Sequence, residues 1–536
     1  MRNYMEAGWF YSGHQIRRYF STRLTSLRPP RAALKNPWEI VRELDGHQWA
    51  MFGVSFAAWT WDAFDFFTVG LCVTEIAEDF GELPSAITWG ITITLMLRSV
   101  GALISGSIGD RYGRKWIMIA NLSLFIILEL CSGFCNTLPQ LLGVRALYGI
   151  CMGGLLGPAV ATALEDLPYD ARGILGALFH QGYAFGYILA ALFYRAFVPT
   201  YGWRSLFWFG AGPPVLIIAW RLYLPETNSF QVLKAAREDE YEKGVRNGSR
   251  FSGLRAFLDE ANKTFRDNWV LFVFMVMLMT AFNCLTHGGD LYPTFLKIQA
   301  EAGPTQVTIV TFIGQVGSIL GSTTAGWFST FAGRRLTMMV CCVMGGALVA
   351  PYVLLRGDRL IAVTISALSQ PYRFVQLLTS PVWGPVPVYL VELSPYALRT
   401  FFYGVTYQLG NLASAASATI EAKIGERFPL PPSPDGKKRF DYGKVIGIYM
   451  GISFVVIMIL VFLGPEMTQK ERDEEASVVL KLEEVRVNGR SLTEMGRRGK
   501  TTAGDTASSS GSEEGMAEKR VRVGKSEAAA ARIEDV

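Results

Sequence analysis

Several features that mark enzymes and nucleic-acid-binding proteins are missing from this chain of 536 residues. It has no phosphate-binding glycine loop, no nucleophile–base motif and no constellation of metal-ligating residues. Lys and Arg total 51 and Asp and Glu total 46, so the formal net charge of +5 gives no indication of nucleic-acid binding. These absences argue against an enzyme, a cofactor, a metal site and a nucleic-acid partner.

Cysteine is also scarce, and the N-terminal stretch lacks the pattern of a cleavable leader. The seven cysteines lie in or beside apolar runs, without a disulfide framework or zinc spacing, so we expect them to pack as small hydrophobic residues. Residues 1–48 contain no apolar segment before a cleavage site. We therefore predict that no signal peptide is present and that the first apolar span directs membrane insertion.

Apolar side chains, in contrast, make up 50% of the chain. A helix needs about 20 mostly apolar residues to cross a bilayer. Twelve segments meet this requirement: 49–73, 86–109, 115–136, 138–164, 173–198, 204–224, 269–296, 306–331, 335–355, 360–390, 400–424 and 444–464. The pattern predicts an all-α membrane protein with twelve transmembrane helices.

Polar segments divide the chain into parts. Residues 225–268 separate six spans from six, which predicts an N-terminal bundle at 49–224 and a C-terminal bundle at 269–464. The tail 465–536 has too few apolar residues for a core, so we expect it to be disordered. Its lysines, serines and threonines are candidate targets for a ubiquitin ligase or a kinase.

Charge asymmetry predicts the orientation. Residues 1–48 hold eight Lys or Arg, and the loop after the second span reads "DRYGRK", whereas the loop after the first span, "TEIAEDFGELPS", has four acids and no base. By the positive-inside rule, both termini and the central loop 225–268 are expected in the cytoplasm. The basic stretch "DGKKRFDYGK" before the last span runs against this rule.

Two loop sequences occur twice. "GSIGDRYGRK" (106–115) recurs as "GWFSTFAGRR" (326–335), and "EDLPYDARG" (165–173) recurs as "ELSPYALRT" (392–400). Five identities share one offset of 227 residues: Glu165 and Glu392, Pro168 and Pro395, Tyr169 and Tyr396, Arg172 and Arg399, Gln181 and Gln408. Two halves with the same direction in the membrane are typical of internally repeated transporters.

These motifs carry a resemblance to the major facilitator superfamily over residues 49–464. "GSIGDRYGRK" matches its loop signature, and "RALYGICMGG" (145–154) matches its fourth-span pattern. The resemblance implies two pseudo-symmetric six-helix bundles around a central cavity, alternating access and a substrate site near the midplane. It also implies that Asp110, Arg111 and Arg114 latch one conformation. In the second copy, Thr330 stands where Asp110 would be.

A narrower resemblance concerns "NCLTHGGDLYPT" (283–294), which is similar to the seventh-span signature of the fungal Jen-type carboxylate–proton symporters. "AWTWDAFDFFTVGL" (58–71), "YQLGNLASAAS" (407–417) and the N-terminal "RLTSLRPP" (23–30) also resemble that family. The resemblance implies proton-coupled uptake of short-chain mono- or dicarboxylates such as lactate, pyruvate or acetate, at the plasma membrane.

One departure keeps other functions open. The family's segment between the histidine and the aspartate is one residue longer and includes a glutamine that contributes to substrate recognition, whereas only Gly288 and Gly289 separate His287 from Asp290. The alternatives are another organic anion, such as a sugar acid, a sialate-like compound or an aromatic acid, and a nutrient sensor that does not transport.

The polar residues of that segment share one helix face. At 100° per residue, Asn283, His287, Asp290 and Thr294 fall within about 60° of arc, so they would form one polar stripe towards the bundle interior. His287 starts near pKa 6.5 and would titrate as a coupled pair with Asp290. We expect this pair to carry the proton and Asn283 to contribute hydrogen bonds to the substrate.

Charged residues inside other spans are candidates because burying a charge in a bilayer is costly. Arg98 is our candidate anion clamp, since a guanidinium offers two parallel hydrogen bonds to a carboxylate; the alternative is a structural ion pair with Asp62 or Asp65. Gln181 and Gln408 would add hydrogen bonds to the substrate. Arg145 is expected to be structural, and Glu129 has no evident partner. In the same span as Arg145, a glycine every fourth residue predicts close helix packing, at Gly149, Gly153 and Gly157.

Overall fold

The structure is a computed structural model that describes residues 17, 19–27, 35–82, 84–235, 237, 252–288, 295, 304–354, 381–431 and 439–466. The chain divides into two units, Met1–Val479 and Leu480–Val536, and all the described residues belong to the first. The predicted disordered tail lies outside the described residues from 467 onward, and so does most of the predicted span at 360–390.

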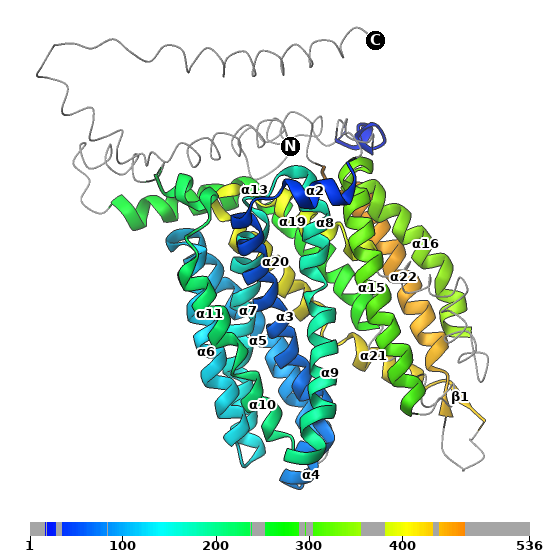
Figure 1. Cartoon of the computed structure of the whole chain (residues 1–536). Helices are drawn as coiled ribbons and strands as arrows, with labels where there is room; N and C mark the ends of the chain where they lie inside the picture. Colours follow the sequence, from blue (N-terminus) through cyan, green and yellow to red (C-terminus); the bar gives the residue numbers. More distant parts are fainter. Residues whose placement is uncertain are drawn as a thin grey trace, which may run out of the picture. The chain divides into compact units, whose positions relative to one another are not determined.

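The first half is helical throughout its described part (Figure 1). A short 3-10 helix, η2 (Thr25–Leu27), precedes α2 (Pro37–Glu43). The remaining helices follow in order: α3 (Gly46–Leu71), α4 (Val73–Phe80), α5 (Pro84–Tyr112), α6 (Arg114–Phe134), α7 (Leu138–Leu164), α8 (Tyr169–His180), α9 (Gly182–Tyr201), α10 (Arg204–Gly210) and α11 (Pro213–Tyr223).

The second half is also mainly helical, with one small hairpin in its described part. Its elements are α13 (Ser252–Gly288), α15 (Pro304–Ala332), α16 (Arg334–Leu354), η4 (Pro381–Trp383), α19 (Val386–Leu393), η5 (Tyr396–Leu398), α20 (Arg399–Ser414), α21 (Ser417–Gly425), β1 (Pro429–Leu430), β2 (Arg439–Phe440) and α22 (Tyr442–Leu463). The two strands pair antiparallel, with Pro429 opposite Phe440.

Local sequence explains where several helices begin and break. α3 starts at a capping box, in which the side chains of Asp45 and Gln48 each accept a hydrogen bond from a backbone N–H of the first turn. The predicted span 204–224 is two helices, α10 and α11, because Pro213 favours the start of a new helix. α13 begins at Ser252, within the segment 225–268 that was expected to be a loop.

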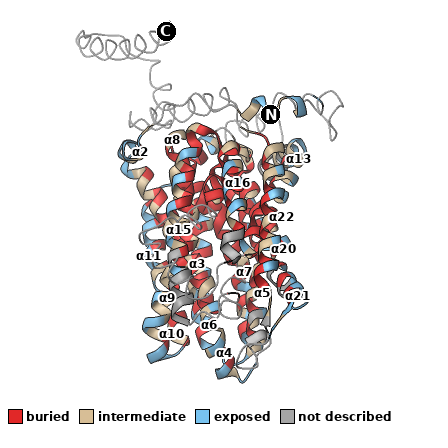
Figure 2. Cartoon of the chain, turned by 90° about the vertical axis from the view of Figure 1, so that its right-hand side faces the viewer, coloured by how far each residue is buried: buried red, intermediate tan, exposed pale blue. Residues whose placement is uncertain are grey.

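Seven helices in the described part of the chain are long and apolar enough to cross a membrane. Their buried side chains face the inside of the helix packing, and exposed apolar ones face outwards (Figure 2). Exposed side chains such as Leu216, Ile127 and Ile452 suit a hydrocarbon surround rather than water. The all-α membrane architecture agrees with the sequence prediction.

Glycines bring α7 against its neighbours. An added Cβ at Gly149 would lie 2.8 Å from the Thr94 Cα of α5, and one at Gly153 would collide with the backbone of Arg98. A Cβ at Gly157 would lie 2.7 Å from the carbonyl oxygen of Thr400 on α20. The glycine face of α7 therefore contacts both α5 and, across the two halves, α20.

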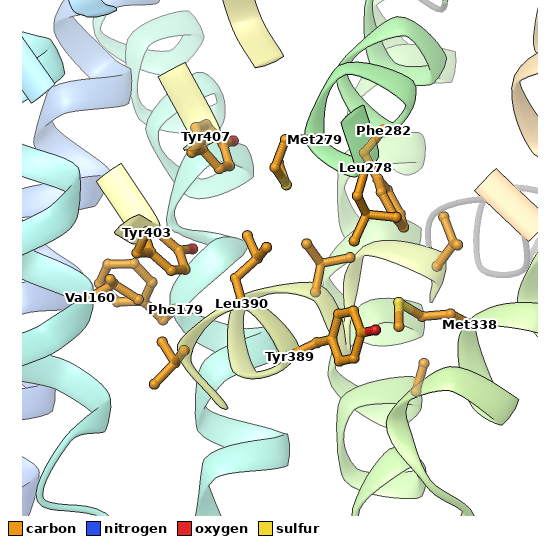
Figure 3. Close-up of a cluster of buried hydrophobic side chains, with 14 of the residues drawn as sticks. Val160, Phe179, Leu278, Met279, Phe282, Met338, Tyr389, Leu390, Tyr403 and Tyr407 are labelled. Carbon is orange, nitrogen blue, oxygen red and sulfur yellow. The ribbon is translucent and has the colours of Figure 1, made fainter. Parts of the chain in front are cut away.

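An apolar core joins the two halves. Figure 3 shows Val160 and Phe179 of the first half in one cluster with Leu278, Tyr389 and Tyr403 of the second. Both Val160 and Phe179 are fully buried. This cluster holds the halves together near the end of the bundle where α2, α8 and α19 lie (Figure 1).

Candidate functional site

The first copy of the repeated loop joins α5 to the start of α20. The Asp110 carboxylate accepts hydrogen bonds from the backbone N–H of Thr400 at 3.1 Å and of Phe401 at 2.8 Å. These N–H groups belong to the first turn of α20, where the helix itself supplies no acceptor and the helix dipole favours a negative charge. Asp110 is therefore a charged cap on a helix of the other half.

Arg114 belongs to the same buried cluster as Asp110. Its guanidinium lies 2.9 Å from Glu165 and 3.6 Å from Asp110, and all three side chains are buried. Burial raises the pKa of the Glu165 carboxyl, and the Arg114 charge lowers it in part. Arg111 lies apart from this cluster, with its guanidinium over the ring of Phe257. The structure thus brings together two of the three predicted latch residues.

The second copy has the same arginine and a different partner set. Arg334 pairs with Glu392 at 3.0 Å and donates hydrogen bonds to Ser329 at 2.8 Å and to Thr330 at 3.1 Å. An added Cβ at Gly173, in the first turns of α8, would collide with Thr330. A hydroxyl therefore occupies the place of the Asp110 carboxylate, so the charge on this helix end is lost in the second copy.

Two more kinds of contact hold the repeated loops in place. Glu226, in the short sequence "LPET", accepts a hydrogen bond from the backbone N–H of Lys115 at 2.9 Å. Glu466, in "GPEM", accepts one from the backbone N–H of Arg334 at 2.8 Å. Arg237 donates to the carbonyl oxygens of Asp110 at 2.7 Å and Ala397 at 3.3 Å, bridging the halves. The repeated Pro-Glu pair is a signal in the sequence that could have predicted these supports.

Replacing Asp110 by asparagine should weaken closure at this end of the bundle. The substitution removes the charge at the start of α20, worth up to about 2 kcal/mol in a buried setting. We expect the ratio of closed to open forms to fall about five- to thirtyfold. Spin labels at the C-terminal end of α5 and the N-terminal end of α20 would report this change as a larger fraction of molecules with a long distance between the two labels.

The control for that experiment is Asp79→Asn. Asp79 pairs with Arg204 at 2.6 Å, but its side chain is 41% exposed, so its charge should matter little. An Asp110→Asn protein with the same distance distribution as the Asp79→Asn protein would contradict the assignment of Asp110 to the latch.

Arg98 lies deep in α5, facing α3 and α20. Its guanidinium is 3.7 Å from the Asp62 carboxylate, contacts the Met152 sulfur and lies over the Phe66 ring at 4.9 Å. Both charged side chains are buried. The Asp62 oxygens and the Arg98 Nε have no hydrogen-bond partner among the described residues. The ion pair is therefore loose, and the guanidinium retains donors for a ligand.

Asp65 belongs to a different cluster from Arg98. Arg145 of α7 contacts Glu129 of α6 at 3.4 Å. An added Cβ at Gly210 of α10 would lie 2.9 Å from Asp65 Oδ1 and 3.3 Å from Glu129 Oε1. Asp65 and Glu129 therefore lie close together within the first half, and Glu129 is the one that pairs with the Arg145 guanidinium. Glu129, which had no evident partner in the sequence, is the partner of Arg145.

The two repeated glutamines both reach across the halves. Gln181 Oε1 accepts a hydrogen bond from Ser318 of α15 at 3.1 Å, and the backbone carbonyl oxygen of Gln408 accepts one from Ser99 of α5 at 3.1 Å. Gln408 Oε1 also accepts from Asn411 at 3.0 Å. Its Nε2 is buried without a partner in the described part of the chain. Gln408 and Arg98 are thus brought to neighbouring turns of α20 and α5.

Trp383 is a central residue that the sequence pattern alone did not single out. Its ring stacks on His180 of α8, with centroids 4.6 Å apart, and lies 5.0 Å from Phe282 and 6.4 Å from Tyr407. It therefore joins three helices where the halves meet. The flanking sequence "PVWGPVP" gave one signal, because prolines and a glycine around a tryptophan indicate a broken helix.

Of the residues predicted in the segment 283–294, Asn283 and His287 lie near the end of α13. Asn283 is buried, with its Nδ2 without a partner among the described residues, and His287 is half-buried. Asp290 and Thr294 lie outside the described residues. The neighbouring Cys284 accepts a hydrogen bond from Ser417 of α21 at 3.8 Å, so this end of α13 packs within the second half.

Comparisons with known proteins agree with this architecture. Residues 48–477 match the family described as "Sugar (and other) transporter". The chain is 37% identical over 499 residues to a "Carboxylic acid transporter protein homolog" of Saccharomyces cerevisiae, covering 90% of this chain and 80% of that one. It is 26% identical to the "Sialic acid transporter NanX" of Escherichia coli, covering 70% and 87%.

A solved structure gives the same fold. The proton:xylose symporter XylE of the major facilitator superfamily, bound to 6-bromo-6-deoxy-D-glucose, aligns with a TM-score of 0.57 at 18% identity, covering 80% of this chain and 98% of that one. The helices, the repeated loops and the family match lead to one conclusion. The chain belongs to the sugar (and other) transporter family within the major facilitator superfamily, and it is an integral membrane transporter, not an enzyme.

Proposed function

We propose that this transporter takes up short-chain carboxylates together with protons, by alternating access across the plasma membrane. The observation that carries the proposal is Arg98, a buried cation that Asp62 holds only loosely at 3.7 Å. A fixed guanidinium at bilayer depth is costly unless it has a function, and a carboxylate is the ligand that its planar donors fit best. The name of the relative at 37% identity supports an organic acid as the substrate.

Buried donors near the contact of the two halves support an anionic ligand. The Arg98 Nε, the Gln408 Nε2 and the Asn283 Nδ2 are buried without partners among the described residues. Buried donors of this kind are rare in folded proteins, and a ligand or water would satisfy them. We infer that Arg98 holds the carboxylate and that Asn283, Gln181 and Gln408 bind the remaining polar groups of the substrate.

Proton coupling is assigned to the pair His287 and Asp290. When the cavity faces outwards, protonation of the pair removes negative charge, so that the anion can enter and the bound charge is balanced. The latch of Asp110 and Arg114 then opens as the halves rock. A higher pH inside releases the proton and the anion into the cytoplasm, where both termini are proposed to lie.

A second candidate is a different organic anion, such as a sugar acid, a sialate or an aromatic acid. The short segment between His287 and Asp290 favours this alternative, and so does the similarity to a sialic acid transporter. A nutrient sensor would bind the same ligands without flux. Competition among lactate, acetate, gluconate, sialate and benzoate would rank the substrates.

The proposal is tested by uptake of radiolabelled lactate at pH 5 and pH 7 in cells that lack their own carboxylate carriers. Because undissociated lactic acid crosses membranes, the uptake must be saturable and sensitive to a protonophore. Saturable uptake that is faster at pH 5 is expected. A protein that reaches the surface and gives no saturable uptake of any acid in the panel would refute carboxylate transport.

A further inference from the structure

The end of α22 is capped by side chains that lie far from it in the sequence. The last carbonyl groups of a helix have no partner within the helix, and the helix dipole favours positive charge beside them. Four consecutive carbonyl oxygens accept side-chain hydrogen bonds here: those of Val461, Phe462, Leu463 and Gly464. Arg335 of α16 donates to the first two, Tyr19 to the third at 2.7 Å and Arg23 to the fourth at 2.7 Å. Residues from the N-terminal segment of the chain therefore help to cap its last transmembrane helix.

The segment 19–27 is docked by several further contacts (Figure 1). The Arg23 side chain is buried, and its guanidinium lies 3.6 Å from the centre of the Tyr19 ring. Ser26 Oγ accepts a hydrogen bond from Arg335 at 2.8 Å and donates one to the carbonyl oxygen of Arg23 at 2.8 Å. Arg335, which is fully buried, thus binds both the end of α22 and the N-terminal segment.

The corresponding helix end in the first half shows what the N-terminal segment adds. Lys115 occupies the position in the first repeated loop that Arg335 occupies in the second. Its ammonium donates to the carbonyl oxygens of Leu222 at 2.8 Å and Leu224 at 2.7 Å, where α11 ends. In both halves, then, a cation of the repeated loop caps the sixth span. In the second half the segment 19–27 takes part as well, although it leads in sequence into α2 and α3 of the first half.

Lys35, further along the same segment, contacts both halves. Its carbonyl oxygen accepts a hydrogen bond from Trp327 Nε1 of α15 at 3.1 Å, and its ammonium lies 3.2 Å from the carboxylate of Asp170 on α8. The helix α2 follows, and its buried Ile40 belongs to the apolar core that joins the halves. Residues 28–34 lie outside the described residues. Separation of α8 from α15 would break one of the two contacts of Lys35.

We propose that the described residues 19–27 and 35–44, here called the N-terminal strap, hold the two halves together at this end of the bundle. The strap continues directly into α3 of the first half, while Tyr19, Arg23 and Ser26 bind the second half. When this end of the bundle opens, the strap must release the second half, and it binds again when the end closes. The strap therefore favours the closed form. This inference goes beyond the proposed function, because it concerns the equilibrium between two conformations and not the substrate.

The test measures this equilibrium in the full-length protein without any substrate. Spin labels at the C-terminal end of α5 and the N-terminal end of α20 report the distance between the halves. Tyr19→Phe/Ser26→Ala removes two hydrogen bonds to the second half and changes no charge. We expect the ratio of long to short distances in this double variant to rise at least about fivefold.

Thr25→Ala is the matched control. Thr25 is exposed, and its hydroxyl donates at 3.0 Å to the carbonyl oxygen of Thr22 within the same segment. Its loss should leave the distance distribution of the wild type unchanged. Trp327→Phe tests the other attachment, since it removes the donor to Lys35, and it should shift the distances in the same direction as the double variant.

The possible results decide between a strap and a merely structural segment. Longer distances in the Tyr19→Phe/Ser26→Ala protein, with those of Thr25→Ala unchanged, support the inference. A double variant that melts at a lower temperature but keeps the wild-type distances makes these contacts structural and overturns it. Should the double variant fail to fold, Tyr19→Phe and Trp327→Phe alone decide, and wild-type distances in both overturn the inference. Because no substrate is present, a failure of lactate uptake leaves the inference standing.

Discussion

Replacing Arg98 by lysine is expected to raise the KM for lactate more than tenfold while the protein still reaches the membrane. Lysine keeps the charge opposite Asp62, but it lacks the planar pair of donors that fits a carboxylate. A hydrogen bond to a charged group contributes about 1.5–3 kcal/mol, which corresponds to a tenfold or larger loss of affinity. Uptake rates as a function of lactate concentration would give the KM.

Arg98→Ala should have a still larger effect, for two separate reasons. It removes the proposed anion clamp, and it leaves the Asp62 carboxylate buried without its cation, at a cost of about 3–5 kcal/mol. The double variant Arg98→Ala/Asp62→Ala removes the second effect. We expect the double variant to yield as much folded protein as the wild type and to remain unable to take up lactate.

This pair of variants separates a clamp from a structural ion pair. Arg195→Lys is the matched control, since Arg195 is exposed on α9. If the double variant transports lactate with the wild-type KM, Arg98 has only a structural role and the proposed binding site is wrong.

The second large effect is expected at Gly153, where α7 meets α5. An added Cβ at this position would collide with the backbone carbonyl of Arg98, and a helix backbone cannot move aside cheaply. Overpacking of this kind costs about 1–3 kcal/mol or more, which exceeds the gain of up to about 1 kcal/mol in helix propensity. Gly153→Ala should therefore lower the thermal stability of the detergent-solubilised protein.

The same helix provides the control. Gly143 has no atom within 4 Å of an added Cβ, so Gly143→Ala should leave stability unchanged or raise it by up to about 1 kcal/mol. Thermal unfolding followed by size-exclusion chromatography would compare the two variants. Equal melting temperatures for the Gly153→Ala and Gly143→Ala proteins would show that the close approach of α5 and α7 does not contribute to stability.

The sequence predicted the membrane architecture because long apolar runs have few other interpretations. The repeated loops were recognisable because each needs a glycine: Gly113 has φ +108° and Gly333 has φ +93°, in a region that other residues rarely adopt. Glycine spacing along α7 likewise reflects backbone contacts that exclude any side chain. Such features depend on local geometry, which a sequence records directly.

Partners across helices could not be predicted in the same way. Asp62 and Asp65 are three residues apart, yet one lies beside Arg98 and the other beside Glu129 and Arg145. Which cation each carboxylate meets depends on how α3 is rotated against α5, α6 and α7, and periodicity alone does not fix this rotation. The position of Trp383 could not be predicted for the same reason.

The central claim is that carboxylate and proton move together through this protein. Its most direct test is purified protein in liposomes that contain a pH-sensitive dye, with labelled lactate added outside at equal pH. We expect saturable lactate entry accompanied by acidification of the lumen, and neither signal in the Arg98→Ala/Asp62→Ala protein. Saturable lactate entry without any movement of protons would contradict the claim.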